Sequence, residues 1–154
     1  MKILIAVVVL FAAVSSAQMT GTGIGIVLGE PTGLSLKSWL STNSAITLGA
    51  AWSFEHDGSL FLWGDYTLHS FNITNAADPR SLAFYYGIGA KVSFIDRNDP
   101  QDDDTVIGAR IPLGLMLPIH TAPIDVFLEI VPTLNLAPDT EFGVNGGIGA
   151  HLFF

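Results

Sequence analysis

The sequence predicts an all-β fold, a single eight-stranded antiparallel up-and-down transmembrane β-barrel. From residue 23 to the last residue, short runs alternate between apolar residues and small or polar ones, and no stretch has helical periodicity. In the segment 142–154, Phe142, Val144 and Ile148 alternate with Asn145 and His151. Successive side chains of a strand point to opposite faces, so one face is apolar and the other is small or polar. A membrane-spanning barrel has this pattern.

Residues 1–17 resemble a secretory signal peptide and are set apart from the fold. Lys2 precedes an apolar run over residues 3–14, and the small residues Ser15, Ser16 and Ala17 follow. The run is too short for a transmembrane helix, which needs about 20 apolar residues. We expect residues 18–154 to form one barrel domain. The sequence has no cysteine, which excludes a lipoprotein anchor and a disulfide framework.

The first half of the chain contains four predicted strands, each bounded by turn-forming residues. They cover residues 22–29, 33–40, 45–54 and 60–70. The segments between them are Glu30-Pro31-Thr32, Thr42-Asn43-Ser44 and His56-Asp57-Gly58, which contain the residue types that favour turns. Several of these strands approach the roughly 9 to 11 residues that a tilted strand needs to cross a bilayer.

The second half contains four more predicted strands, at residues 82–94, 105–117, 124–131 and 142–154. Pro112 lies inside the second of these. Because proline cannot donate a hydrogen bond to a neighbouring strand, we expect a bulge or a local distortion there. With an even number of strands, both termini lie at the same end of the barrel, which is normally the periplasmic end.

Composition agrees with a membrane barrel and argues against nucleic-acid binding. Hydrophobic residues make up 49% of the sequence and charged residues 13%, with a formal net charge of -8 and a mean hydropathy of +0.50. Nucleic-acid binding requires a basic surface that neutralises phosphates. A soluble, secreted ligand-binding barrel is the alternative, but it would have an apolar interior and charges on its outer face.

All ionisable residues within the predicted strands fall on the glycine-rich face, which we assign to the barrel interior. The predicted interior charge network consists of Lys37, Asp65, Lys91, Arg110, Asp125 and Glu129. An unpaired charge in such a space would cost several kcal/mol, so the positive and negative side chains should neutralise one another. Asp65 and Lys91 are predicted on neighbouring strands, as are Arg110 and Glu129. The network predicts a closed interior, with a proton or ion path as the alternative.

Two histidines, His69 and His151, are predicted near the periplasmic rim, where His151 could approach Asp125. A lipid-modifying enzyme would need a nucleophile, a base and an orienting group within hydrogen-bond reach, and no spacing in the sequence indicates such a set. We therefore expect no enzymatic activity and assign no catalytic residue. Histidines that fill a polar interior are the simpler interpretation.

The segment 96–104 is rich in aspartate. Asp102, Asp103 and Asp104 are weak candidates for binding a divalent cation, because the segment lacks the spaced ligands, the turn glycine and the closing glutamate of a calcium loop. A solvated acidic loop is the better interpretation. We expect no metal and no cofactor.

Several motifs resemble those of small bacterial outer-membrane β-barrel proteins of the eight-stranded, outer-membrane-protein-A-like type. They lie at residues 29–37 (GEPTGLSLK), 65–69, 86–89 (YGIG), 110–114 (RIPLG), 127–132 and 146–149 (GGIG). The resemblance covers nearly all of the mature chain. It implies the outer membrane as location, and it implies that Phe154 resembles the carboxy-terminal signal read by the barrel-assembly machinery. Members of this family are generally known only as barrels of unknown function.

The sequence thus predicts a small outer-membrane barrel with a structural or envelope-integrity role. The alternatives are a lipid-modifying enzyme and a barrel that binds a ligand or a partner through its external loops. The expected partners are outer-membrane lipid and, during insertion, the barrel-assembly machinery. We expect a monomer.

Overall fold

The computed structural model describes residues 21–53, 59–71, 82–95, 104–119 and 121–154, and these residues form an antiparallel β-barrel. The predicted signal peptide (1–17) lies outside the described residues. No helix in the described ranges is long and apolar enough to cross a membrane. The described residues contain nine strands: β1 (Thr22–Glu30), β2 (Thr32–Trp39), β3 (Ser44–Ser53), β4 (Ser59–Ser70), β5 (Ala83–Ile95), β6 (Asp104–Arg110), β7 (Leu113–Ile119), β8 (Ile124–Ala137) and β9 (Glu141–Phe153).

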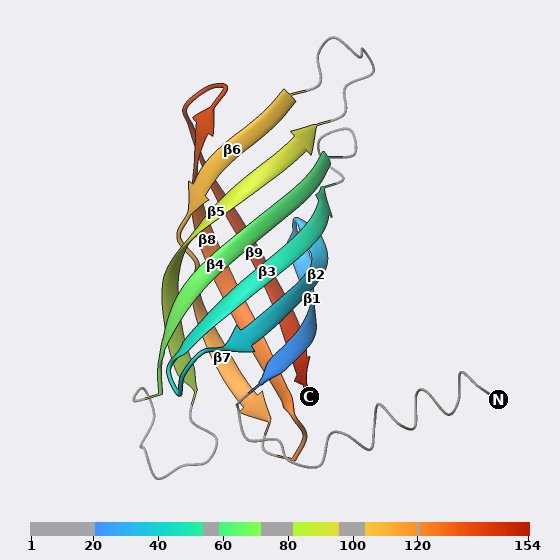
Figure 1. Ribbon diagram of the computed structural model, residues 1–154, viewed down its shortest axis with the longest axis vertical. Helices are drawn as coiled ribbons and strands as arrows, with labels where there is room; N and C mark the ends of the chain where they lie inside the picture. The colour runs from blue at the N-terminus through green and yellow to red at the C-terminus, as the bar shows by residue number, and fades with distance from the viewer. Residues whose placement is uncertain (1–20, 54–58, 72–81, 96–103, 120) are drawn as a thin grey trace, which may run out of the picture.

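The strands close into a ring because the first strand pairs with the last. β1 pairs with β2 on one side and with β9 on the other, and the other strands pair with their neighbours around the rest of the ring. Figure 1 shows the strands tilted steeply around the barrel, with the start of β1 and the end of β9 at the same end. We call this the terminal end. The opposite end, which carries the β1–β2 and β8–β9 turns, is called the loop end.

The predicted sixth strand is divided at Pro112 into β6 and β7, which occupy one position in the ring. Both pair with β5 and both pair with β8. The Gly87 N–H donates to the Pro112 carbonyl at 3.0 Å, and the Ile111 N–H donates to the Pro132 carbonyl at 2.9 Å. The return bond is missing in both pairs, because neither proline has an N–H. The expected distortion at Pro112 is therefore confirmed, and the barrel has eight strand positions.

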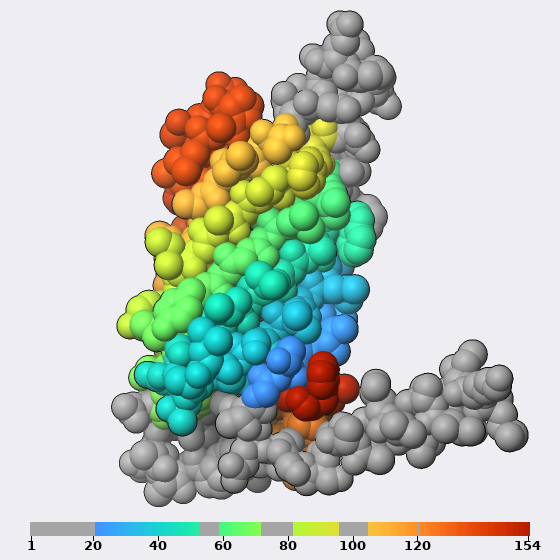
Figure 2. Space-filling view, viewed as in Figure 1, coloured from blue at the N-terminus to red at the C-terminus, as the bar shows by residue number. Residues whose placement is uncertain are grey.

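The two faces of the wall differ as the alternation predicts. Large apolar side chains point outward, among them Ile88 (66% exposed) and Ile130 (58% exposed). The inward side chains include every charged residue of the predicted network, and Asp125 is only 1% exposed. Figure 2 shows the outer surface of one side, where side chains of adjacent strands fill the wall. Aromatic residues share the interior with the charges: Trp39, Phe61, Trp63, Tyr85, Phe127 and Phe153.

Candidate functional site

The polar interior contains two groups of interacting side chains. The Asp125 group consists of Ser35, Lys37, Asp125 and His151. The Arg110 group consists of Asp65, Tyr85, Arg110 and Glu129. The side chains come from β2, β4, β5, β6, β8 and β9, and all are inward members of the alternating pattern.

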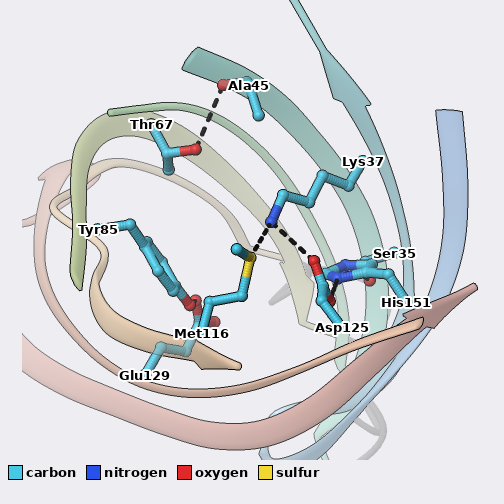
Figure 3. Close-up of polar contacts among 9 residues, drawn as sticks. All are labelled: Ser35, Lys37, Ala45, Thr67, Tyr85, Met116, Asp125, Glu129 and His151. Atoms are coloured by element: carbon cyan, nitrogen blue, oxygen red, sulfur yellow. Dashed lines mark hydrogen bonds and ion pairs between the residues drawn. The ribbon is translucent and has the colours of Figure 1, made fainter. Parts of the chain in front are cut away.

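Asp125 is the centre of its group and accepts two charged or polar contacts. Lys37 Nζ lies 3.1 Å from its Oδ2 atom, and His151 Nδ1 lies 2.8 Å from its Oδ1 atom. The other face of the Lys37 ammonium contacts Met116 Sδ at 3.2 Å. Figure 3 shows Lys37 and Asp125 pointing toward each other inside the barrel, with the Met116 sulfur beside the ammonium. Lys37 thus reaches a carboxylate near the terminal end.

The sequence did not identify Ser35 as a member of this group. Its hydroxyl shares a 3.0 Å hydrogen bond with His151 Nε2. When Nδ1 donates to Asp125, Nε2 is left to face the serine, so the three residues are arranged in the order of a serine–histidine–aspartate triad. All three are at least 95% buried. The sequence signal that could have identified Ser35 is its position two residues before Lys37, which puts both side chains on the same inward face.

Arg110 is the centre of the second group and faces two carboxylates. Its Nε atom lies 2.9 Å from Asp65 Oδ1, an ion pair without hydrogen-bond geometry between these two atoms. Its Nη2 atom lies 3.8 Å from Glu129 Oε1. The Tyr85 hydroxyl donates to the other oxygen of Glu129 at 2.9 Å. We expected Glu129 as the main partner of Arg110, but Asp65 is closer.

Asp65 and Lys91 lie on neighbouring strands, as predicted. Among the described residues Asp65 makes its ion pair with Arg110, and the Lys91 ammonium lies 5.3 Å from the centre of the Phe61 ring. The Arg110 guanidinium lies 5.1 Å from the centre of the Trp63 ring. The electron-rich faces of aromatic rings attract cations, so the aromatic residues of the interior help to accommodate its positive charges.

Glycines determine which interior side chains can meet. The Asp65–Arg110 pair reaches across Gly89, which pairs with Asp65 on β4 and with Arg110 on β6. Gly114 separates Tyr85 from Glu129 in the same way, and Gly25 separates Ser35 from His151. A Cβ atom on any of these glycines would overlap one of the side chains that meet across it. Each contact thus spans an intervening strand, over a residue without a side chain.

His69, the second predicted rim histidine, belongs to neither group. Its ring packs 4.5 Å from the Trp39 ring and 5.1 Å from the Tyr85 ring, measured between centres. Its backbone N–H donates to the Asn43 carbonyl at 2.7 Å. Neither ring nitrogen has a hydrogen-bond partner with acceptable geometry among the described residues, although the ring is buried.

The remaining candidates are the acidic segment and the carboxy-terminal residue. Asp102 and Asp103 fall outside the described residues, and Asp104 begins β6. No group of three or more possible metal ligands occurs within the described ranges. Phe154 follows β9, is 64% exposed, and its N–H donates to the Thr22 carbonyl at 3.0 Å.

Comparison with known proteins supports the fold. No protein-family model and no curated protein sequence matches the chain. Among solved structures, the N-terminal β-barrel domain of OprF from Pseudomonas aeruginosa is similar, with a TM-score of 0.65 and 13% sequence identity. The match covers 89% of this chain and 100% of that chain. The chain has the outer-membrane-protein-A-like barrel fold. At this identity, the similarity concerns the fold alone.

Proposed function

We propose that this protein is a small integral outer-membrane barrel, closed to solutes, with a structural role in the bacterial envelope. The main observation behind the proposal is that the barrel has an apolar outer face and a charged interior, which is the reverse of a soluble barrel. Leu128 is 55% exposed on the outer face, whereas Lys37 and Arg110 are each only 3% exposed in the interior. A soluble barrel would hide the aliphatic side chains and expose the charges, whereas lipid solvates an apolar outer face.

The ion pairs and the size of the ring support a closed interior. Barrels with about eight strands have an interior just wide enough for side chains to fill. Here ion pairs cross the interior at two levels, and aromatic rings pack between them. A central cavity lined by residues of both polar groups has a volume of about 20 Å³. This space holds about one water molecule, so hydrated ions and nutrients do not fit.

Membrane fractionation combined with heat-dependent gel mobility tests the membrane location. We expect the protein in the outer-membrane fraction, with a shift in mobility after boiling, because a folded barrel resists detergent until it is heated. Recovery in the soluble periplasmic fraction would contradict the proposal. Planar-bilayer recordings test closure, and regular open steps in KCl would contradict it. Growth of a deletion strain under envelope stress tests the structural role.

The proposal includes export by the predicted signal peptide and insertion as a monomer. Outer-membrane lipid would contact the apolar face, and the barrel-assembly machinery would read the terminal Phe154. An interaction role through the external loops remains the alternative, and the acidic segment that is its best candidate lies largely outside the described residues.

A lipid-modifying hydrolase is a second candidate function, favoured by the triad-like arrangement of Ser35, His151 and Asp125. The hydrogen bonds of 3.0 Å and 2.8 Å suit a serine activated by a histidine. However, Ser35 lines the cavity of about 20 Å³, which has no room for an ester group. A lipid-hydrolysis assay on purified protein tests this candidate with Ser35→Ala as the matched variant. Serine-dependent hydrolysis would replace the structural proposal.

A further inference from the structure

The β8–β9 hairpin extends farther from the terminal end than the β1–β2 turn beside it. Pairing between β1 and β9 stops at Glu30 and Gly146, whereas pairing between β8 and β9 continues as far as Asn135 and Glu141. Figure 1 shows this difference in height, and in Figure 2 the hairpin projects at the loop end above the first two strands. Among the described residues, the segment 141–145 of β9 therefore has a partner strand on one side only.

The unpaired side of this segment presents backbone hydrogen-bonding groups. In an antiparallel pair, the N–H and C=O groups of successive residues point alternately to one side and to the other. The Phe154 N–H donates to the carbonyl of Thr22 on β1, and neither register of β9 contains a shift. Counting back in steps of two places the N–H and C=O groups of Phe142 and Val144 on the same side. No strand in the described part of the chain pairs with these four groups.

The same two residues carry exposed apolar side chains on the outward face. Phe142 is 68% exposed and Val144 is 58% exposed, and Leu134 of β8 lies opposite Phe142. Open sheet edges do not occur in the hydrocarbon of a membrane, because unpaired backbone groups there cannot bond to water. We therefore expect this part of the hairpin to lie beyond the hydrocarbon, where water surrounds both the edge and the apolar side chains.

The segment 141–145 (EFGVN) lacks the features that usually keep a strand edge from pairing. Protected edges carry lysine, proline, a bulge or an inward charge in the middle of the strand. Here the pairing with β8 is continuous, and the one charged residue, Glu141, begins the strand. The edge is therefore open to a further strand.

We infer that the edge of β9 at residues 141–145 binds an extended, basic segment of a partner protein. The segment would add to the wall as an antiparallel strand in the position where β1 stops. Backbone hydrogen bonds to Phe142 and Val144 would provide affinity, and the alternating side chains would provide specificity. The inference rests on the proposed membrane insertion, with the loop end on the external side.

The two faces of the edge select alternating side chains in the partner segment. Apolar side chains on its outward face would cover Phe142 and Val144, as cross-strand neighbours do within a sheet. On the inward face, Gly143 leaves space, because a Cβ atom there would meet one threonine hydroxyl at 3.1 Å and nothing closer. Long side chains of the partner segment fit on that face.

The charge of the hairpin selects basic side chains for those inward positions. Asp139 and Glu141 lie at its tip, and residues 134–146 contain no lysine or arginine. Opposite charges on the two partners favour their encounter and fix the register of pairing. Lysine or arginine at alternate positions of the partner segment would complement this tip.

The tilt of the strands argues against a second copy of this chain as the occupant. Two copies inserted in one membrane have the same orientation, so their β9 strands both run from the loop end to the terminal end. Strands of such barrels tilt by about 35 to 45°. About a two-fold axis normal to the membrane, two facing β9 edges would cross at about 70 to 90° instead of lying side by side.

The test measures binding of a short synthetic peptide, with alternating valine and lysine, to the full mature chain in lipid nanodiscs. In an antiparallel added strand, the residues beside Phe142 and Val144 are also those whose N–H groups face β9. N-methylation of the valines should therefore abolish binding, measured by fluorescence anisotropy. N-methylation of the lysines should leave the affinity within about twofold. Replacing the lysines by glutamates should weaken binding about tenfold or more.

Val144→Pro tests the same contact from the side of the protein. It removes an N–H that faces the open edge and not β8, so the barrel should fold while peptide affinity falls about tenfold or more. Val144→Thr keeps the N–H and the shape of the side chain, and its affinity should stay within about threefold of wild type. Heat-dependent gel mobility checks the folding of both variants.

Each outcome supports or overturns the inference. Inserted wild-type protein that binds no peptide overturns it and leaves the proposed function intact. Equal binding of the peptide methylated at its valines, which requires no variant to fold, overturns pairing through the backbone. Dimers of the wild-type chain that Val144→Pro dissociates would make a second copy the occupant and overturn the partner proposed. Failure of the wild-type chain to insert overturns the proposed function and the inference with it.

Discussion

Replacing Gly89 by alanine should weaken the Asp65–Arg110 ion pair without removing either charge. The added Cβ would overlap the Asp65 carboxylate, so the carboxylate, the guanidinium or the wall must shift. Overpacking of a tight interior costs about 1 to 3 kcal/mol. The ion pair adds a second contribution because its separation of 2.9 Å must increase.

The electrostatic contribution can be estimated from that distance. At an effective dielectric constant of about 20, the attraction between unit charges is about 6 kcal/mol at 2.9 Å and falls by about 1 to 1.5 kcal/mol when the separation grows by about 1 Å. Together the two contributions predict that Gly89→Ala lowers the free energy of unfolding by about 2 to 4 kcal/mol. Urea unfolding in detergent micelles, followed by tryptophan fluorescence and gel mobility, measures this change.

Gly64→Ala provides the matched control on the neighbouring strand. A Cβ at Gly64 would meet only the flexible end of Leu48, at 3.1 Å, and would touch no interior charge. We expect a change within about 0.5 to 1 kcal/mol, as is usual for substitutions that disturb no buried feature. If Gly89→Ala is no more destabilising than Gly64→Ala, the glycine does not provide the space that the ion pair needs.

Three further predictions concern the ion pairs and the carboxy terminus. Arg110→Met leaves two interior carboxylates without their cation and should lower the free energy of unfolding by about 3 to 5 kcal/mol. Lys37→Met should destabilise by a similar amount, and adding Asp125→Asn should recover part of the loss, because the second change removes the uncompensated charge. Phe154→Ala should slow membrane insertion in cells with little change in the stability of purified protein, because the exposed side chain packs little while its backbone bond remains.

Each of these predictions has an outcome that would contradict it. Equal unfolding midpoints for Arg110→Met and wild type would mean that water, rather than Arg110, solvates the carboxylates. A double variant less stable than Lys37→Met alone would exclude charge pairing as the main role of Lys37. For Phe154→Ala, pulse-chase measurement of the heat-resistant form follows insertion. An unchanged rate of insertion would mean that the terminal residue is not needed for assembly.

The sequence by itself determined the fold class and the orientation of each side chain. Alternation within a strand is a local property, so the outward position of Ile88 and the inward position of Lys37 could be read without knowing which strands are neighbours. The disturbance at Pro112 was also predictable, because the missing N–H belongs to the residue itself. An even number of strand positions then followed, with both termini at one end.

Only the tertiary structure decided which interior side chains meet. Ser35 lies on β2 and His151 on β9, yet a row of paired residues places them on either side of Gly25. Asp65 pairs with Arg110 rather than with Lys91 for the same reason, since Gly89 is the residue that lies between them. These contacts depend both on the stagger between strands and on the positions of the glycines. The stagger cannot be read from any single segment of the chain. Alternation of side chains is local, whereas their pairing across the barrel depends on closure of the whole ring.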